Sequence, residues 1–325
     1  MRICLRGSSG VLLSLMLAGV ARGQEPGRVF YQGVIDGKLA ISMSLRFDES
    51  GSVTGGYSYA TSAEGLGLLG TWKGKKLALE ESTGWVSQED PKGISGRFRL
   101  VRNDDGSLAG DWTSADGKRT LSVAVAKVAE SVVVPVPPRD DVPPGCTLTN
   151  EYLRFPERND FFKALNKREK AGGLVDMSEN TYPTTYCEDV TYADASLVSI
   201  IYTSQMYDNH ESVTTDSGNF VWRDGKLVDV ELQDLIDASP ATLKALRKMC
   251  VEAIKGDAER PEQLVFTLKE HPGVNVTRAG LEFTISGYDV GDNHMVRVLT
   301  VMLPWKKIGK YVPEGSPIRH LVDGH

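Results

Sequence analysis

The sequence has few of the residues on which metal and redox sites are usually built. Four cysteines and five histidines occur among 325 residues, and no C-x-x-C pair is present. Zinc ligation and dithiol redox chemistry therefore have no local support. Lysine and arginine (37) are outnumbered by aspartate and glutamate (43), which gives a net charge of −6. We therefore expect no cofactor, and no binding to the phosphate backbone of nucleic acids.

The common enzyme motifs are missing as well. The sequence contains no Gly-rich phosphate loop ending in Lys-Ser or Lys-Thr, no H-E-x-x-H, no G-x-S-x-G and no Rossmann fingerprint. Its composition, 41% hydrophobic and 25% charged, is that of an ordinary globular protein. These absences favour a protein that is not an enzyme.

The N-terminus has the features of a secretory signal peptide. Arg2 and Arg6 precede the apolar run 11–20, and small residues follow up to a predicted cleavage site after Gly23. Ten apolar residues are too few to cross a membrane, which takes about 20 in a helix. We therefore expect removal of 1–23, a periplasmic or secreted protein, and no membrane span after cleavage. Cleavage removes three arginines and no acid, which makes the net charge −9.

A proline-rich segment divides the remaining chain. Five of the 15 prolines lie within ten positions of the stretch 133–144, VVPVPPRDDVPP. Such a segment is extended and unsuited to a central strand. We therefore predict a linker at 129–145 between two independently folding domains, 24–128 and 146–325.

The first domain is predicted to be all-β, either a meander or a small barrel. Glycine fills 15 of the 101 positions from 28 to 128, about twice the usual 7%. Ile41, Met43 and Leu45 alternate with polar residues, as in a half-buried strand, and Asp-Gly, Ser-Gly and Lys-Gly pairs mark hairpin turns. The pattern predicts eight strands, at 29–35, 41–47, 52–60, 65–72, 75–81, 94–102, 107–113 and 118–127.

A glycine followed by an aromatic residue recurs in this domain every 12 to 15 residues, close to the length of one strand-turn-strand unit. Two interpretations are open. The aromatic rings pack against glycines of neighbouring strands, or they form a ring at a barrel mouth that binds a sugar or an apolar ligand. The pairs are Gly55 and Tyr57, Gly70 and Trp72, Gly84 and Trp85, Gly96 and Phe98, and Gly110 and Trp112.

The second domain is predicted to be α+β, with helices covering one face of an antiparallel sheet. Ser239 and Pro240 are typical of a helix start, and an apolar face continues from them to Gly256. A second helix is predicted from Asn159 to the glycines before position 174. Strands are predicted at 147–155, 184–193, 195–207, 217–223, 264–269, 280–288 and 296–303.

Two segments of this domain carry a resemblance to a known family. The stretch 197–236 (LVSIIYTSQMYDNHESVTTDSGNFVWRDGKLVDVELQDLI) has the order strand, loop with a central His, strand, short Asp-Leu helix. The stretch 280–305 (GLEFTISGYDVGDNHMVRVLTVMLPW) adds Gly-Leu, Phe, Tyr-x-Val-Gly and Leu-Pro-Trp. This order resembles the extracytoplasmic C-terminal domain shared by the anti-sigma factor RsiV and the peptidoglycan deacetylase PdaC, over roughly 146–312. The resemblance implies an α+β domain outside the membrane, and the RsiV branch is similar to a lysozyme receptor.

The resemblance does not extend to an activity. The deacetylase domain with its metal ligands and the sigma-binding segment have no counterpart in this sequence. We therefore expect an exported, non-catalytic binding or scaffold protein of the cell envelope that engages a lysozyme, another envelope protein or peptidoglycan. The expected contact residues lie in two loops at strand ends, where a rigid sheet presents side chains for recognition: Tyr207, His210, Glu211, Asp292, Asn293 and His294.

The alternative is an envelope hydrolase that uses His210 or His294 with neighbouring acids. A deep pocket joining the two loops would favour this alternative. The oligomeric state does not follow from the sequence.

Three cysteines remain after signal cleavage, which allows one disulfide in an oxidising compartment. Cys250 lies on the apolar face of the predicted helix that starts at Ser239, and the strand near Cys187 in the resembled family is the nearest candidate partner. We therefore predict a Cys187–Cys250 disulfide, with Cys146–Cys187 as the main alternative.

Overall fold

The computed structural model divides the chain into two compact units. Of the described residues, the first unit contains those up to Val133 together with Leu153–Pro156, and the second contains those of Val134–Tyr152 and Glu157–His325. The predicted signal peptide lies outside the described residues, and independent folding of the two domains stays a prediction. The described residues are 27–60, 65–83, 93–134, 136, 140, 142, 148–173, 184–207, 211–291 and 298–323.

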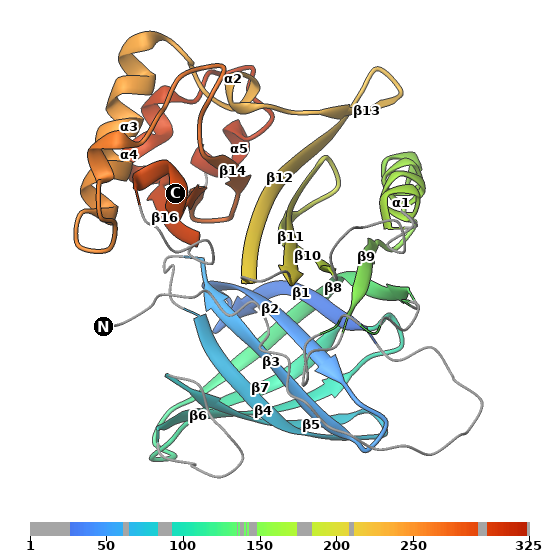
Figure 1. Cartoon of the computed structure of the whole chain (residues 1–325). Coiled ribbons are helices and arrows are strands. Elements are labelled where there is room, and N and C mark those ends of the chain that lie inside the picture. Colours follow the sequence, from blue (N-terminus) through green and yellow to red (C-terminus); the bar gives the residue numbers. More distant parts are fainter. Residues whose placement is uncertain are drawn as a thin grey trace. The chain divides into compact units, whose positions relative to one another are not determined.

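Eight antiparallel strands form a closed barrel in the first unit (Figure 1). Each strand pairs with the next one in sequence, and the last pairs with the first, which closes the sheet. The prediction of a small barrel is thereby confirmed. The strands are β1 (Arg28–Ile35), β2 (Leu39–Phe47), β3 (Ser52–Tyr59), β4 (Gly65–Lys73), β5 (Lys76–Ser82), β6 (Ile94–Arg102), β7 (Leu108–Ser114) and β8 (Thr120–Val134).

Alternating side chains fill the barrel with one apolar core. On β2, Ile41, Met43, Leu45 and Phe47 are buried, whereas the residues between them are partly exposed. Side chains of the same kind from the other strands, such as Phe98 of β6, complete the cluster. Burial of these side chains stabilises the closed form, because each contributes roughly 1.5–3 kcal/mol.

The aromatic residues of the glycine repeat pack inside this unit. A Cβ atom at Gly96 would lie 2.3 Å from Nε1 of Trp112, so the missing side chain makes room for the indole. The rings of Tyr57 and Phe98 are buried and meet edge to face, with centroids 5.4 Å apart. The interpretation that the rings pack against glycines is therefore correct for Trp112, whereas Tyr57 and Phe98 are buried against each other and Trp85 lies outside the described residues.

A buried carboxylate connects several strands of the barrel. Glu81 of β5 is only 3% exposed. Its Oε2 atom accepts hydrogen bonds from the Tyr57 hydroxyl (2.5 Å) and from Nε1 of Trp112 (2.7 Å), and its Oε1 atom accepts one from the Ser95 hydroxyl (2.6 Å). Three donors therefore offset the loss of hydration of this charge.

The second unit contains two mainly antiparallel sheets, and the strand β9 of the first one ends in residues that belong to the first unit. In the first sheet the strands follow one another in sequence order, and Asn150 of β9 adds a parallel pairing with Tyr186. Its strands are β9 (Asn150–Arg154), β10 (Thr184–Ala193), β11 (Leu197–Tyr207), β12 (Glu211–Arg223) and β13 (Lys226–Asp229). The second sheet consists of β14 (Gly273–Val276), β15 (Gly280–Ser286) and β16 (Val298–Pro304).

Both helices predicted for this unit are present and begin as expected. The Asn159 side chain accepts a hydrogen bond from the backbone N–H of Phe162, and the Ser239 hydroxyl accepts one from that of Thr242. None of the described helices has the length and apolar character that a membrane span requires. The helices are α1 (Asp160–Gly173), α2 (Leu232–Leu235), α3 (Pro240–Ile254), α4 (Trp305–Ile308) and α5 (Arg319–Asp323), with 3₁₀ turns at Pro261–Gln263, Gly287–Val290 and Gly309–Tyr311.

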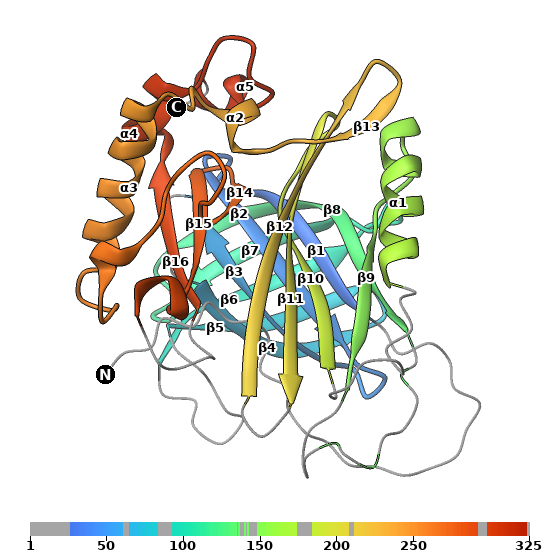
Figure 2. The same ribbon diagram turned by 45° about the horizontal axis from the view of Figure 1, so that its top comes forward.

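The predicted arrangement, with helices on one face of one sheet, is only partly right. Helix α1 packs on the first sheet, where Phe161 lies 6.5 Å from the ring of Trp222. Helix α3 packs instead against β16 of the second sheet (Figure 2). The strand predicted at 264–269 is absent, because Leu264 and Phe266 reach the core from an irregular segment.

The predicted Cys187–Cys250 disulfide is not formed. Cys250 lies on the buried face of α3 within the core shared with β14, β15 and β16, and burial raises the pKa of its thiol to about 12. Cys187 lies on β10, in register with Thr203 of β11. The two cysteines therefore belong to different layers of the unit. Cys146 lies outside the described residues, so the alternative pairing with Cys187 stays a prediction.

Candidate functional site

The six residues predicted to contact a partner are described only in part. Tyr207 and Glu211 are paired through their backbones at the ends of β11 and β12, and their side chains lie outside the described parts. The loop residues His210, Asp292, Asn293 and His294 lie entirely outside the described residues. Contact of these six residues with a partner therefore stays a prediction.

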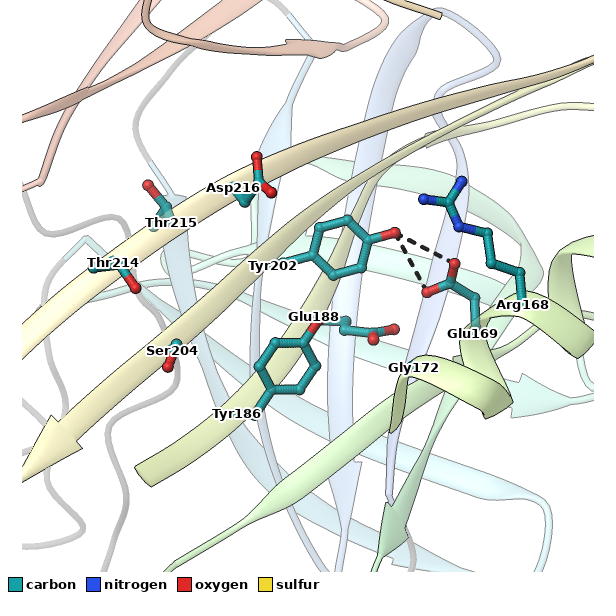
Figure 3. A pocket seen from close by; sticks show the side chains of 10 residues that line it. All are labelled: Arg168, Glu169, Gly172, Tyr186, Glu188, Tyr202, Ser204, Thr214, Thr215 and Asp216. Carbon is teal, nitrogen blue, oxygen red and sulfur yellow. Dashed lines mark hydrogen bonds between the residues drawn. The ribbon is translucent and has the colours of Figure 1, made fainter. Parts of the chain in front are cut away.

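A pocket of about 500 Å³ lies between α1 and the strands β10, β11 and β12 (Figure 3). The sequence had singled out none of its residues. Its floor is buried, its walls are half-buried, and its rim is exposed. It is lined by Arg168, Glu169, Gly172, Tyr186, Glu188, Tyr202, Ser204, Thr214, Thr215 and Asp216.

Strand register places most of these side chains in two rows on one face of the sheet. Glu188 stands opposite Tyr202, and Tyr202 stands opposite Asp216. The neighbouring row consists of Tyr186, Ser204 and Thr214. Residues directly opposite each other have Cβ atoms about 5 Å apart. Each row therefore presents adjacent polar and aromatic groups to one ligand-sized space.

The Tyr202 ring is held in place from two sides. A Cβ atom at Gly218 would lie 2.8 Å from this ring, so the glycine allows the ring to lie across β12. The Tyr186 ring runs nearly parallel to it, at an interplanar angle of 18° and a centroid distance of 6.4 Å. From this position the Tyr202 hydroxyl donates to the carboxyl group of Glu169, at 3.3 Å and 3.4 Å from its two oxygens.

Two buried carboxyl groups meet at the floor of the pocket. Glu169 of α1 and Glu188 of β10 are 3% and 2% exposed, and their side chains are hydrogen-bonded to each other. In Figure 3 both carboxyl groups point toward the same spot beside Tyr202. A hydrogen bond between two carboxyl groups requires a proton on one of them. Burial raises the pKa of Glu169, which favours a protonated carboxyl group in this pair.

Arg168 is the cationic residue at the rim of the pocket, and its charge is offset by an ion pair within the protein. The guanidinium forms an ion pair with Asp229 of β13 and lies 4.1 Å from the centroid of the Phe220 ring. Both contacts hold it at the edge of the pocket, where it is 43% exposed. The lining thus combines acids, hydroxyls and tyrosine rings.

Burial is the main cause of a raised pKa at Glu169, with opposing contributions from the Glu188 hydrogen bond, Arg168 and Tyr202. A carboxyl group with a raised pKa binds its proton more tightly in the folded state. Its contribution to stability is therefore full below the unfolded-state pKa and is lost as the pH rises through the folded-state pKa.

We expect Glu188→Gln to reduce the loss of folding stability that occurs at high pH. The amide donates the hydrogen bond to Glu169 without a shared proton and removes the like charge. The variant should therefore be more stable than the unmodified protein at pH 8, and the difference should disappear at pH 4. Urea denaturation at both pH values measures this. Glu252→Gln, on the exposed side of α3, serves as the control, and parallel pH profiles for all three proteins would contradict the assignment.

One signal in the sequence marks Glu169. Phe162, Leu165 and Glu169 have the spacing i, i+3, i+7 and share the buried side of α1, so a carboxylate lies in an otherwise apolar stripe. Charged residues are rarely buried without a partner. The partner, Glu188, carries no such mark, because it lies in a strand whose residues alternate in the ordinary way.

Among the described residues, no three His, Cys, Asp or Glu side chains are grouped so that they could hold a metal ion. No protein-family model matches the sequence, and no curated protein matches it. Solved structures of the DUF3298 family are similar to it at low identity. A DUF3298 family protein from Pseudomonas aeruginosa PAO1 is 16% identical, with a TM-score of 0.36, over 58% of this chain and 93% of that one. A member of the same family from Bacteroides fragilis is 12% identical, with a TM-score of 0.35, over 51% of this chain and 68% of that one.

Proposed function

We propose that the protein is an exported, non-catalytic binding protein of the cell envelope, and that its second unit holds a saccharide of the peptidoglycan type in the pocket below α1. The observation that carries this proposal is the convergence of two rows of hydroxyl, carboxyl and tyrosine side chains on one cavity of about 500 Å³. Ligand pockets of proteins measure about 300–1,000 Å³. Hydroxyl and carboxyl groups suit the hydroxyls of a sugar, and the tyrosine rings offer flat apolar surface.

The arrangement of the acids supports binding over glycoside hydrolysis. Glycosidases hold their two carboxyl groups about 5–5.5 Å apart when they retain and about 6.5–9.5 Å apart when they invert the anomeric configuration. Glu169 and Glu188 are instead hydrogen-bonded directly to each other and nearly buried. A hydrolase based on His210 or His294 is a separate possibility, which the experiment below also addresses.

A saccharide is favoured over a lysozyme as the partner of this pocket. A protein partner requires an interface of roughly 800 Å² on each side, whereas the pocket is a confined cavity with a buried floor. The apolar run at 11–20 supports export, and the net charge of −9 after cleavage suits an encounter with basic envelope proteins. Lysozyme binding at another surface is compatible with the proposal.

We expect the mature protein, residues 24–325, to bind soluble peptidoglycan fragments in isothermal titration calorimetry. Tyr186→Ala should weaken this binding more than tenfold, since truncation of a central aromatic contact costs about 2 kcal/mol or more. Tyr288→Ala, which removes an exposed tyrosine elsewhere in the same unit, should leave the affinity unchanged. Because Tyr186 is half-buried, Thr214→Arg at the exposed rim provides a second variant that blocks the pocket without touching the core.

Three outcomes would contradict the proposal. The first is unchanged affinity in both pocket variants. The second is binding of lysozyme but of no saccharide. The third is the release of new reducing ends from the fragments, which would show a hydrolase. Melting temperatures measured on the same samples separate lost binding from lost folding.

A further inference from the structure

The charges around the two buried carboxyl groups point to one class of ligand. The groups that face the pair are Arg168 from α1, Tyr186 from β10, Tyr202 from β11, Asp216 from β12 and Asp229 from β13. Arg168 alone is cationic among the described residues that line the pocket, and Asp229 already offsets it. Asp216 at the rim is exposed, and the pair adds a further negative charge. The residues around the pocket therefore carry a net negative charge.

We propose that the ligand carries a protonated amine, as an amino sugar with a free amino group does, and that its ammonium group displaces the proton shared by Glu169 and Glu188. The inference rests on the proposed function and specifies its ligand. On binding, the proton leaves the carboxyl pair for the solvent. The ammonium group then lies against two carboxylates, and no covalent bond changes.

Three features of the geometry favour an ammonium group. In the row Glu188, Tyr202, Asp216 an acid stands on each side of an aromatic ring, and ammonium groups are attracted both to carboxylates and to aromatic faces. Two adjacent buried carboxyl groups cannot both ionise without a cation, because like charges in a poorly solvated site repel strongly. A bound ammonium supplies that cation. The hydroxyls of Ser204 and Thr214 in the neighbouring row suit the hydroxyls of a sugar ring rather than the plain methylene chain of a lysine side chain.

Other ligand charges fit less well. A carboxylate or phosphate group would bring a like charge to the buried pair. An N-acetylated sugar is neutral at this position and would leave the shared proton in place. The amino sugar should therefore bind more tightly than its N-acetylated counterpart, and its binding should depend on pH.

The test is calorimetric titration of the mature protein at pH 6.5 with a glucosamine tetrasaccharide and, separately, with the matching N-acetylglucosamine tetrasaccharide. Each titration is made in two buffers of different ionisation enthalpy. We expect the free-amine tetrasaccharide to bind at least tenfold more tightly. Its apparent enthalpy should differ between the buffers by an amount that corresponds to about one proton released, as linkage requires. The acetylated tetrasaccharide should release none.

Variants connect this result to the carboxyl pair. Glu188→Gln should abolish both the proton release and the preference for the amine, whereas Glu252→Gln on α3 should retain both. Asp216→Asn, at the exposed rim, should weaken amine binding several-fold and provides a test that does not disturb the buried pair. A preference for the amine that persists in both pocket variants would overturn the inference.

The outcomes separate the two proposals. Equal binding of the two tetrasaccharides without a buffer effect would overturn the inference and leave the proposed function standing. Failure of both to bind, under conditions where the protein is folded, would overturn the proposed function as well. Binding of lysozyme without either saccharide would likewise contradict both the amino sugar and the proposed function of the pocket.

Discussion

Replacing Glu81 by alanine is expected to lower the free energy of unfolding of the barrel by about 4 kcal/mol. Glu81 is buried and accepts hydrogen bonds from Tyr57, Ser95 and Trp112. Alanine leaves these three donors without their acceptor, and breaking a buried, charged network costs about 3–5 kcal/mol. Glu81→Gln keeps one acceptor oxygen and should lose less. Urea denaturation of the mature chain, followed by tryptophan fluorescence, measures the difference.

The neighbouring glutamate provides the control. Glu80 has an exposed side chain, which forms a surface ion pair with Arg97. Surface pairs of this kind contribute up to about 1 kcal/mol, so Glu80→Ala should have a small effect. Equal losses for the two alanine variants would show that the buried network does not stabilise the barrel.

Replacing Asn275 by alanine is expected to destabilise the second unit by about 3 kcal/mol. The side chain is fully buried, and it connects β14 with two strands of the other sheet. Its Nδ2 atom donates to the Ser199 hydroxyl (3.1 Å) and the Ile200 carbonyl (2.8 Å), and its Oδ1 atom accepts from the Ser217 hydroxyl (2.7 Å). Each bond contributes about 1 kcal/mol, and the groups left unpaired add to the loss.

The measurement for Asn275→Ala is again denaturation of the mature chain, with amide hydrogen exchange as a local readout. The N–H of Val276, which donates to the Ser199 hydroxyl at 3.0 Å, should exchange faster in the variant. Gln233→Ala removes an exposed amide from α2 of the same unit and should change stability by less than about 0.5 kcal/mol. Unchanged exchange at Val276 together with unchanged stability would refute the role of Asn275 in joining the two sheets.

The barrel strands were predictable because their signals are local. Alternation of apolar and polar side chains places one face of each strand in the core, and glycine-containing turns end the strands. Consequently the predicted strands 52–60 and 94–102 agree closely with β3 and β6. The same holds for α1 and α3, whose first turns are capped by Asn159 and Ser239.

The pocket was not predictable in this way. Its carboxyl groups, Glu169 and Glu188, come from α1 and β10, and Tyr202 and Asp216 come from two further strands. The sequence drew attention instead to the histidines in two polar loops. Histidine is conspicuous as a titratable residue, whereas a glutamate in a strand resembles any solvent-exposed acid until its register is known.

By itself, the sequence determined the all-β character of the first unit, the helices α1 and α3, and the apolar run that predicts export. These features depend on the spacing of residues close together along the chain. Only the tertiary structure decided that Glu169 and Glu188 line one pocket as buried acids and that Asn275 joins two sheets. It also decided that Cys250 lies in a different layer from Cys187. Contacts of this kind depend on strand register and layer packing, where a shift of one residue moves every side chain to the opposite face.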